Sequence, residues 1–161
     1  MNNRSRRKLG TYWDGEVGSA RGRLPLPVQV YQEGALARIY YYERIGGRCP
    51  ASDFLESLES SARNKFDGPF FTITRMGAKY CNDVRFKQLH GRGKPLWEFK
   101  EHAHRLYCLR QVLQGGIFVN IVLFYGWAKK SAGRTEKEDR EIQKAVDLYN
   151  EFLQEYPGGN V

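Results

Sequence analysis

The feature that most constrains the fold is the apolar run from Ile117 to Trp127. Side chains of a β-strand alternate between its two faces, and both alternating sets are apolar here. One face would carry Val119, Ile121, Leu123 and Tyr125, and the other Phe118, Val122 and Phe124. A strand that is apolar on both faces is typical of the interior of a sheet. The run therefore predicts a central strand, not an edge strand.

Two further strands are expected just before this run. Leu96–His102 and Arg105–Val112 would be joined by a two-residue turn at Ala103-His104, and Gln114–Gly116 would reverse the chain into the central strand. Basic residues flank these strands on both sides: Lys94, Lys100, Arg105, Arg110, Lys129, Lys130 and Arg134. A small antiparallel sheet with so many cations around one apolar strand indicates a surface that binds a polyanion.

The distribution of charge supports the same interpretation. The chain of 161 residues has a net charge of +8, and residues 83–134 hold ten Lys/Arg against three Asp/Glu. Residues 135–161 instead hold three Lys/Arg against seven Asp/Glu. The positive charge thus concentrates on the expected sheet, where a nucleic acid backbone could release counterions. The alternative is an ordinary solvated surface on a basic protein.

The first half of the ordered chain predicts one strand and two helices. Arg38–Glu43 is β-branched and aromatic, as strands are, and Pro50 is suited to the first turn of a helix. A second helix should start near Ser60, and Gly68-Pro69 should interrupt it because proline removes a helical N–H and clashes with the previous turn. Helical periodicity would then resume from Phe70 to Cys81, with its aromatics in the core.

The second half predicts strands followed by one long helix. Val84–Leu89 reads as a strand, and His90–Pro95 as a glycine-rich basic loop without the spacing of a phosphate-binding P-loop. Thr135 followed by Glu138 predicts a capped helix that runs through Gln154. The fold class expected is α+β: a small, twisted, mostly antiparallel sheet with two N-terminal helices packed on it and a C-terminal helix.

One domain is expected, from residue 37 to residue 156. Residues 1–36 are rich in Gly, Pro and Arg and would form a flexible extension, although Leu26–Tyr31 could pair weakly with the sheet. Residues 157–161 would be a tail. The three cysteines lack metal-ligand spacing and are best explained as free thiols of a cytoplasmic protein. No apolar stretch reaches the length of a membrane span.

Several pieces, in this order, resemble one family. They are PxxxFL from Pro50 to Leu55, Phe86–Leu89, Leu96-Trp97-Glu98-Phe99-Lys100, His104–Tyr107, and Ile121–Lys130 with its Gly126-Trp127-Ala128-Lys129-Lys130 end. The chain from Ala37 to Gln154 is similar to the RelE/HigB-type toxins of bacterial toxin–antitoxin pairs, in their phage-derived branch. Relatives often carry arginine where Lys100 stands, and a tyrosine typical of the final helix region has no clear counterpart here.

The resemblance implies an endoribonuclease that cuts mRNA on the ribosome, without a cofactor, and that a helix-turn-helix antitoxin inhibits. Attack by the neighbouring 2′-OH needs a base, cations around the phosphorane and a proton for the leaving group. Arg105, Lys129, Lys130, Glu98 and Tyr125 are the expected catalytic residues, with Arg105 the strongest candidate. Contacts to RNA are expected from Lys87, His90, Arg92, Lys94, Lys100, Tyr107 and Arg110.

Each candidate has a simpler structural interpretation. Trp97, a possible stacking partner for a base beside Tyr107, shares a strand face with Phe99 and is better explained as core. Glu98 and Lys100 could pair with cross-strand charges, and Tyr125 could be core. His102 and His104 with Cys108 lack a fourth metal ligand. Two alternative functions stay open: a ParE-like toxin that binds gyrase without hydrolysis, and an inactive RNA-binding protein.

Overall fold

The structure, a computed structural model, describes residues 28–77, 84–112 and 118–155. These residues form six strands: β1 (Val28–Glu33), β2 (Ala37–Tyr42), β3 (Phe86–Gln88), β4 (Trp97–Glu101), β5 (His104–Val112) and β6 (Val119–Ala128). They also form the helices α1 (Pro50–Ser57), α2 (Ser60–Met76) and α3 (Glu136–Glu155), and the short 3-10 helix η2 (Gly91–Gly93). The α+β class expected from the sequence is confirmed.

The strands form one mixed sheet in the order β1-β2-β6-β5-β4-β3. Four of its five pairings are antiparallel, and only β2 and β6 run parallel, with Ile39 opposite Ile121. β6 therefore lies inside the sheet, between β2 and β5. The central position predicted from its apolar residues is confirmed.

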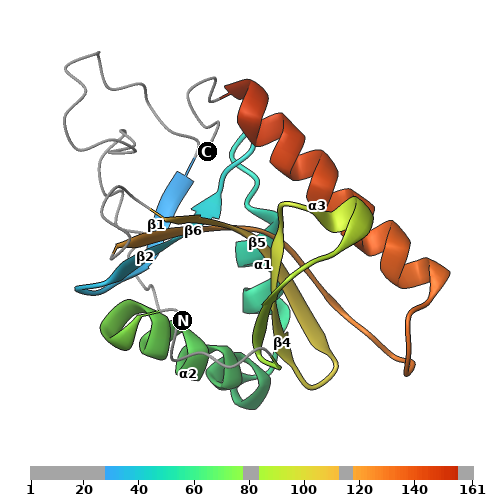
Figure 1. The fold of residues 1–161 in the computed structure, drawn as a ribbon, viewed down its shortest axis with the longest axis horizontal. Helices are drawn as coiled ribbons and strands as arrows, with labels where there is room; N and C mark the ends of the chain where they lie inside the picture. Colours follow the sequence, from blue (N-terminus) through green and yellow to red (C-terminus); the bar gives the residue numbers. More distant parts are fainter. Residues whose placement is uncertain (1–27, 78–83, 113–117, 156–161) are drawn as a thin grey trace.

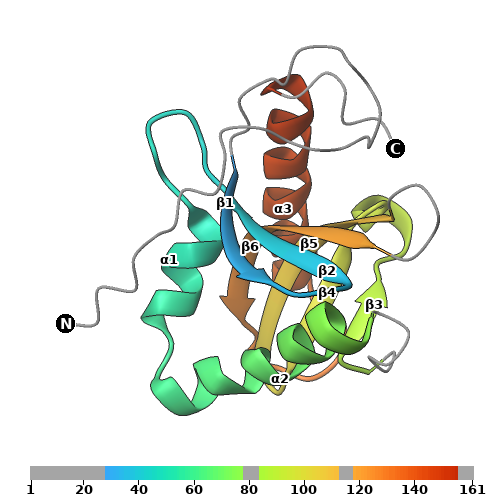
Figure 2. The same ribbon diagram turned by 90° about the vertical axis from the view of Figure 1, so that its left-hand side faces the viewer.

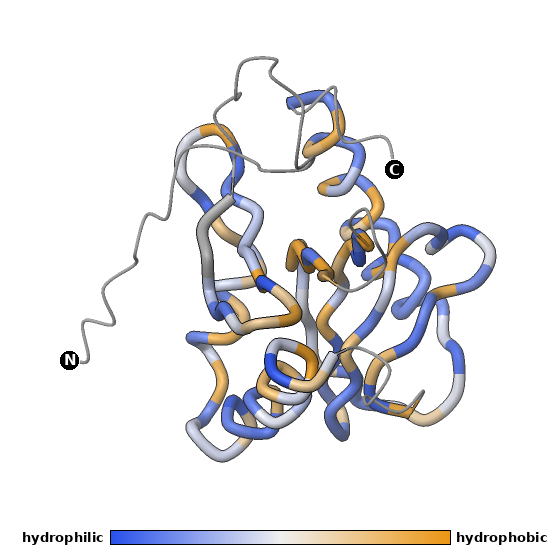
Figure 3. The backbone as a smooth tube through the Cα atoms, turned by 60° about the vertical axis from the view of Figure 1, so that its left-hand side comes forward, coloured by the Kyte–Doolittle hydropathy of each residue, from blue (hydrophilic) through white to orange (hydrophobic). Residues whose placement is uncertain are grey.

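Helices cover both faces of the sheet (Figures 1 and 2). α1 and α2 lie on one face, the α1/α2 face, where Leu55, Phe66, Phe70 and Ile73 pack on Ile39, Phe99, Ile121 and Leu123. α3 lies on the other, the α3 face, where Ile142, Ala145, Leu148 and Phe152 pack on Tyr42, Leu109, Val122 and Phe124. Apolar and polar residues alternate along α3, as expected for a helix with one buried side (Figure 3).

A β-bulge in β6 changes which face its last residues occupy. Tyr107 of β5 pairs with Tyr125, but the next residue, Cys108, pairs with Leu123, so Phe124 is an extra residue on β6. Phe124 and Tyr125 consequently both pack on the α3 face. The expectation that Tyr125 shares a face with Leu123 is wrong, because strict alternation holds only while the ladder has no inserted residue.

The expected break of the second helix at Gly68-Pro69 is also wrong. α2 runs without interruption from Ser60 to Met76 and contains Pro69. Phe66, Phe70 and Ile73, on both sides of the proline, are at most 1% exposed. Burying three such side chains contributes roughly 1.5–3 kcal/mol each, which outweighs the cost of about 3 kcal/mol for an internal proline.

Ordered structure begins earlier than residue 37. β1 spans Val28–Glu33 and pairs antiparallel with β2, so part of the expected flexible extension is an edge strand. The ring of Tyr31 lies 4.9 Å from that of Tyr41 and 5.5 Å from that of Phe70, measured between centroids. The weak pairing considered for Leu26–Tyr31 is therefore a true strand from Val28 on.

The β4–β5 hairpin turns one residue earlier than expected. β4 ends at Glu101 and β5 begins at His104, so the turn consists of His102 and Ala103. His102 has a φ of 50°, in the left-handed region that two-residue hairpin turns use. Three expectations lie outside the described residues: the reversal at Gln114–Gly116, the end of the helical stripe near Cys81, and the tail at residues 157–161.

Candidate functional site

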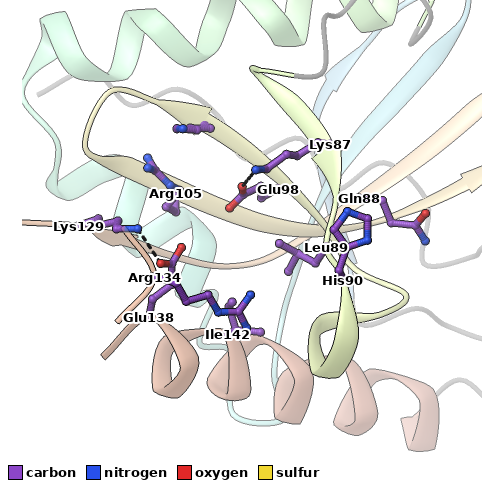
Figure 4. Close-up of a pocket in the computed structure, with 11 residues that line it drawn as sticks. Lys87, Gln88, Leu89, His90, Glu98, Arg105, Lys129, Arg134, Glu138 and Ile142 are labelled. Atoms are coloured by element: carbon purple, nitrogen blue, oxygen red, sulfur yellow. Dashed lines mark hydrogen bonds and ion pairs between the residues drawn. The ribbon is translucent and has the colours of Figure 1, made fainter. Parts of the chain in front are cut away.

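A cleft of about 230 Å³ opens between β3, β4, β5 and α3 on the α3 face (Figure 4). Its walls include five cationic side chains, two carboxylates and one imidazole: Lys87, Lys100, Arg105, Lys129 and Arg134, then Glu98 and Glu138, then His90. Gln88, Leu89 and Ile142 complete the lining. The cleft is smaller than most small-molecule pockets, and its excess of cations suits an anionic ligand.

Strand alternation delivers three of these side chains from β4 and β5. Trp97 and Phe99 pack on the α1/α2 face. Glu98 and Lys100 alternate with them along β4 and therefore line the cleft on the α3 face. Lys100 pairs directly across the hairpin with Arg105. Two cations thus lie side by side at one end of the cleft, and neither forms an ion pair with a carboxylate among the described residues.

Arg105 is anchored by the backbone of its own hairpin. Its Nη1 donates to the carbonyl oxygens of His102 at 2.6 Å and His104 at 3.1 Å, and the residue is only 7% exposed. Both hydrogen bonds use one nitrogen, so the other guanidinium N–H groups can face the cleft. A fixed guanidinium that is always charged suits the recognition of a phosphate.

Glu98 is a buried carboxylate beside these cations. It is 4% exposed, and its Oε1 lies 3.4 Å from Nζ of Lys87, which comes from the neighbouring strand β3. Figure 4 shows the two side chains pointing toward one another within the cleft. A carboxylate held in this way can accept a proton from a ligand hydroxyl.

Lys129 and Glu138 form a second ion pair in the lining of the cleft. Nζ of Lys129 lies 2.6 Å from Oε2 of Glu138, and the side chains are 11% and 12% exposed. The backbone N–H of Lys129 also donates to the carbonyl oxygen of Ala103, at 2.6 Å, which holds the end of β6 against the hairpin turn. The bulge in β6 puts Lys129 on the α3 face, two residues beyond Trp127.

The start of α3 confirms one half of the predicted capping motif. The hydroxyl oxygen of Thr135 accepts a hydrogen bond from the backbone N–H of Glu138 at 3.2 Å. The carboxylate of Glu138, however, contacts Lys129 instead of returning to the backbone at Thr135. The pattern that suggested a cap therefore also contained a residue of the cleft.

Of the residues predicted from the sequence, six line the cleft: Arg105, Lys129, Glu98, Lys87, Lys100 and His90. Arg134 and Glu138 line it too and were not predicted as site residues. The sequence singled out both residues for other reasons: Arg134 as one of the basic residues that flank the apolar run, and Glu138 as part of the helix cap. Gln88, Leu89 and Ile142 gave no functional signal.

Other predicted residues lie elsewhere. Lys130, Arg92 and Lys94 are exposed and do not line the cleft. Arg110 lies on the α1/α2 face, where its guanidinium carbon is 4.7 Å from the ring centroid of Trp97. Alternation along β5 explains this position, because Arg110 shares the side of Leu106 and Cys108.

The two predicted tyrosines take structural positions. Tyr107 is fully buried and its hydroxyl oxygen accepts a hydrogen bond from Nε1 of Trp127 at 2.8 Å, so it cannot stack on an RNA base. Burial raises the pKa of Tyr107. The Tyr125 hydroxyl donates to Glu141 and lies outside the cleft lining. Burial and this hydrogen bond raise the pKa of Tyr125, which disfavours a role as a base.

The described residues contain neither a cluster of metal ligands nor a helix suited to a membrane. No group of three or more His, Cys, Asp or Glu residues among them could hold a metal ion. In the same part of the chain, no helix is both long and apolar enough to cross a membrane.

Comparison with known proteins adds no family assignment. No model of a protein family matches the chain, and no curated protein matches it either. Fold and cleft together define the chain as an α+β protein with a basic cleft that suits phosphate ligands.

Proposed function

We propose that the protein is a metal-independent endoribonuclease of the RelE/HigB type, the toxin of a type II toxin–antitoxin pair. Its substrate would be mRNA, cut on the ribosome, and its inhibitor a helix-turn-helix antitoxin. The sheet with α1 and α2 on one face and α3 on the other would be the RelE-like arrangement. The sequence pieces between Pro50 and Lys130 support this family, and the cleft supports the chemistry.

The observation that carries the proposal is a buried carboxylate inside a basic cleft. Glu98 is 4% exposed among five cations. A carboxylate at this position repels phosphates and so weakens their binding. A nuclease that uses the substrate's 2′-OH needs a proton acceptor within reach of the phosphate. Glu98 therefore favours an enzyme over a protein that only binds.

All reacting groups of the proposed reaction come from the RNA and from side chains of the cleft. Glu98 takes the proton of the 2′-OH, and that oxygen attacks the adjacent phosphorus. Arg105, Lys100 and Lys129 stabilise the charge of the phosphorane. The bond from phosphorus to the 5′-oxygen then breaks, and His90, an exposed residue of the lining, would act as the acid that gives the leaving oxygen a proton. The products are a 2′,3′-cyclic phosphate and a 5′-hydroxyl.

The test is cleavage of ribosome-bound mRNA by the full chain in EDTA, with analysis of the product ends. Glu98→Gln should lower the cleavage rate by roughly 10²–10⁴-fold and still bind a 2′-O-methyl oligonucleotide, which cannot be cut. Glu136→Gln is the matched control, because the Glu136 side chain is 95% exposed and the charge change is the same. Products with a 5′-phosphate, or full activity of Glu98→Gln, would refute the mechanism.

Growth arrest separates this function from the alternatives. Induction of the wild-type chain should stop protein synthesis immediately, whereas a gyrase-binding toxin would induce a DNA damage response. Loss of both effects would indicate an inactive RNA-binding protein.

A further inference from the structure

The contact between Lys129 and Glu138 is unusual among the ion pairs of the cleft. Its atoms are 2.6 Å apart and both side chains are nearly buried, at 11% and 12% exposure. Lys87 pairs with Glu98 at 3.4 Å but is 47% exposed, and the Arg134–Asp139 pair is about half exposed at both ends. The Lys129–Glu138 pair is the one that water screens least.

The carboxylate of Glu138 resembles a phosphate in the way it contacts Lys129. Carboxylate and phosphate both present anionic oxygens to an ammonium group at the same hydrogen-bond distances. Since Glu138 and Lys129 both line the cleft, the carboxylate occupies the place on Lys129 that a phosphate oxygen would take. A phosphate that approaches Lys129 must therefore compete with Glu138 for its ammonium group.

The geometry of α3 limits movement of Glu138 to its side chain. The backbone N–H of Glu138 is bound to Thr135, and that of Asp139 to the Thr135 carbonyl oxygen at 3.1 Å. Four positions on, Ile142 is 2% exposed and packed in the core. The backbone of this turn is therefore fixed, and a rotation of the Glu138 side chain is the available route.

We propose that Glu138 is an internal competitor for the phosphate position on Lys129, and that it makes the cleft selective for polyanions over single phosphates. The inference rests on the proposed function and adds a residue that determines ligand specificity. A single phosphate gains only the contacts around Lys129 and must compete with Glu138 there. An RNA strand also brings phosphates to Lys87, Lys100 and Arg134, and these contacts offset the competition.

The test measures binding of inorganic phosphate to the full chain by phosphorus NMR titration at low salt. Glu138→Gln should raise phosphate affinity about tenfold, equivalent to the loss of one competing ion pair. Glu136→Gln makes the same charge change on an exposed residue of the same helix and should leave the affinity unchanged. Lys129→Gln combined with Glu138→Gln should remove the gain. Affinity for a 2′-O-methyl oligonucleotide should rise less than about threefold in Glu138→Gln.

Equal phosphate affinity in the wild type and Glu138→Gln would overturn the inference. So would an equal rise in Glu136→Gln, which would show that net charge alone matters. Glu138→Asp keeps the charge but is shorter by one methylene, and it should bind phosphate with intermediate affinity; it carries the test if Glu138→Gln does not fold. None of these measurements uses cleavage, so a chain that binds as expected but cuts no RNA would refute the proposed function and leave this inference standing.

Discussion

Arg105 and Arg110 lie on the same strand and serve opposite faces of the sheet. Arg105 lines the cleft and is held by two hairpin carbonyl oxygens. Arg110 lies over Trp97 on the α1/α2 face. Substituting either arginine removes one guanidinium from β5, so the two variants can be compared directly.

Arg105→Ala should lower RNA cleavage on the order of 10²-fold or more, since it removes a donor to the phosphorane. Its free energy of unfolding should also fall, by about 1 kcal/mol for each lost carbonyl contact. Arg110→Ala should cut RNA at the wild-type rate. Single-turnover cleavage and chemical denaturation of both variants test this prediction. Normal cleavage by folded Arg105→Ala would remove Arg105 from the mechanism.

Much of the cleft could be predicted from the sequence, because alternation along a hairpin is a local property. It correctly separated Glu98 and Lys100 from Trp97 and Phe99. The burial of Tyr107 could not be predicted in this way. Alternation puts it on the same face as Arg105, but only the packing of α3 and Trp127 decides that it is buried.

Two elements differ from their sequence-based predictions, α2 and β1, because tertiary contacts outweigh local preferences in both. Pro69 breaks a helix by local rules, and the burial of Phe66, Phe70 and Ile73 overrides that rule. β1 has weak local signals and is stabilised by pairing with β2 and by the contacts of Tyr31. Neither outcome can be read from a window of neighbouring residues.

β1 leads to a prediction about truncation that differs from the sequence-based one. A flexible extension over residues 1–36, as the sequence predicts, could be removed without loss of the fold, but removing residues 1–34 deletes β1 and the Tyr31 packing. We now expect that truncation to lower the free energy of unfolding by at least about 2 kcal/mol. Removing only residues 1–27 retains every described strand and should have a much smaller effect. Urea denaturation of both truncated chains is the measurement, and equal midpoints would contradict it.

α3 is held on the sheet by carboxylates whose pKa values are shifted. Hydrogen bonds from Arg44 lower the pKa of Glu151 below its ordinary value of 4.5, although burial opposes this. Burial also opposes ionisation of Glu141, but hydrogen bonds from Tyr125 and Lys144 outweigh it, so its pKa is lowered too. A carboxyl whose pKa is lower in the folded state stabilises the protein above its unfolded pKa, and this stability is lost as pH falls through the folded pKa.

Glu151→Gln should therefore be less stable than the wild type at neutral pH, and the difference should shrink as pH falls below 4.5. Denaturation curves recorded from neutral pH to about pH 3 test this prediction. Glu136→Gln, at a 95% exposed position, should show no such pH-dependent difference. A constant difference for Glu151→Gln at all pH values would show that its ion pair with Arg44 does not contribute.

For the whole molecule, the side of the sheet that carries a cation should determine its effect on RNA binding. Lys100 lines the cleft, whereas Arg75 is exposed on α2, on the other side of the sheet. Lys100→Gln should reduce the slope of log affinity against log salt concentration by about 0.7, the value for one contact to a single strand. Arg75→Gln should leave the slope unchanged. Fluorescence titration of a 2′-O-methyl oligonucleotide at several salt concentrations gives both slopes, and equal reductions would mean that RNA binding is not confined to the cleft.

The bulge at Phe124 has a consequence for how this cleft could change during evolution. Every residue of β6 after the bulge takes its face from whether the number of preceding residues is odd or even. A point substitution leaves that parity unchanged, so Tyr125, Trp127 and Lys129 can each be replaced without moving their neighbours to the other face. Deletion of one residue would reverse it and turn Lys129 toward α1. The face on which Lys129 lies thus depends on the number of residues that precede it in β6. Substitutions do not change this number, but deletion of a single codon does.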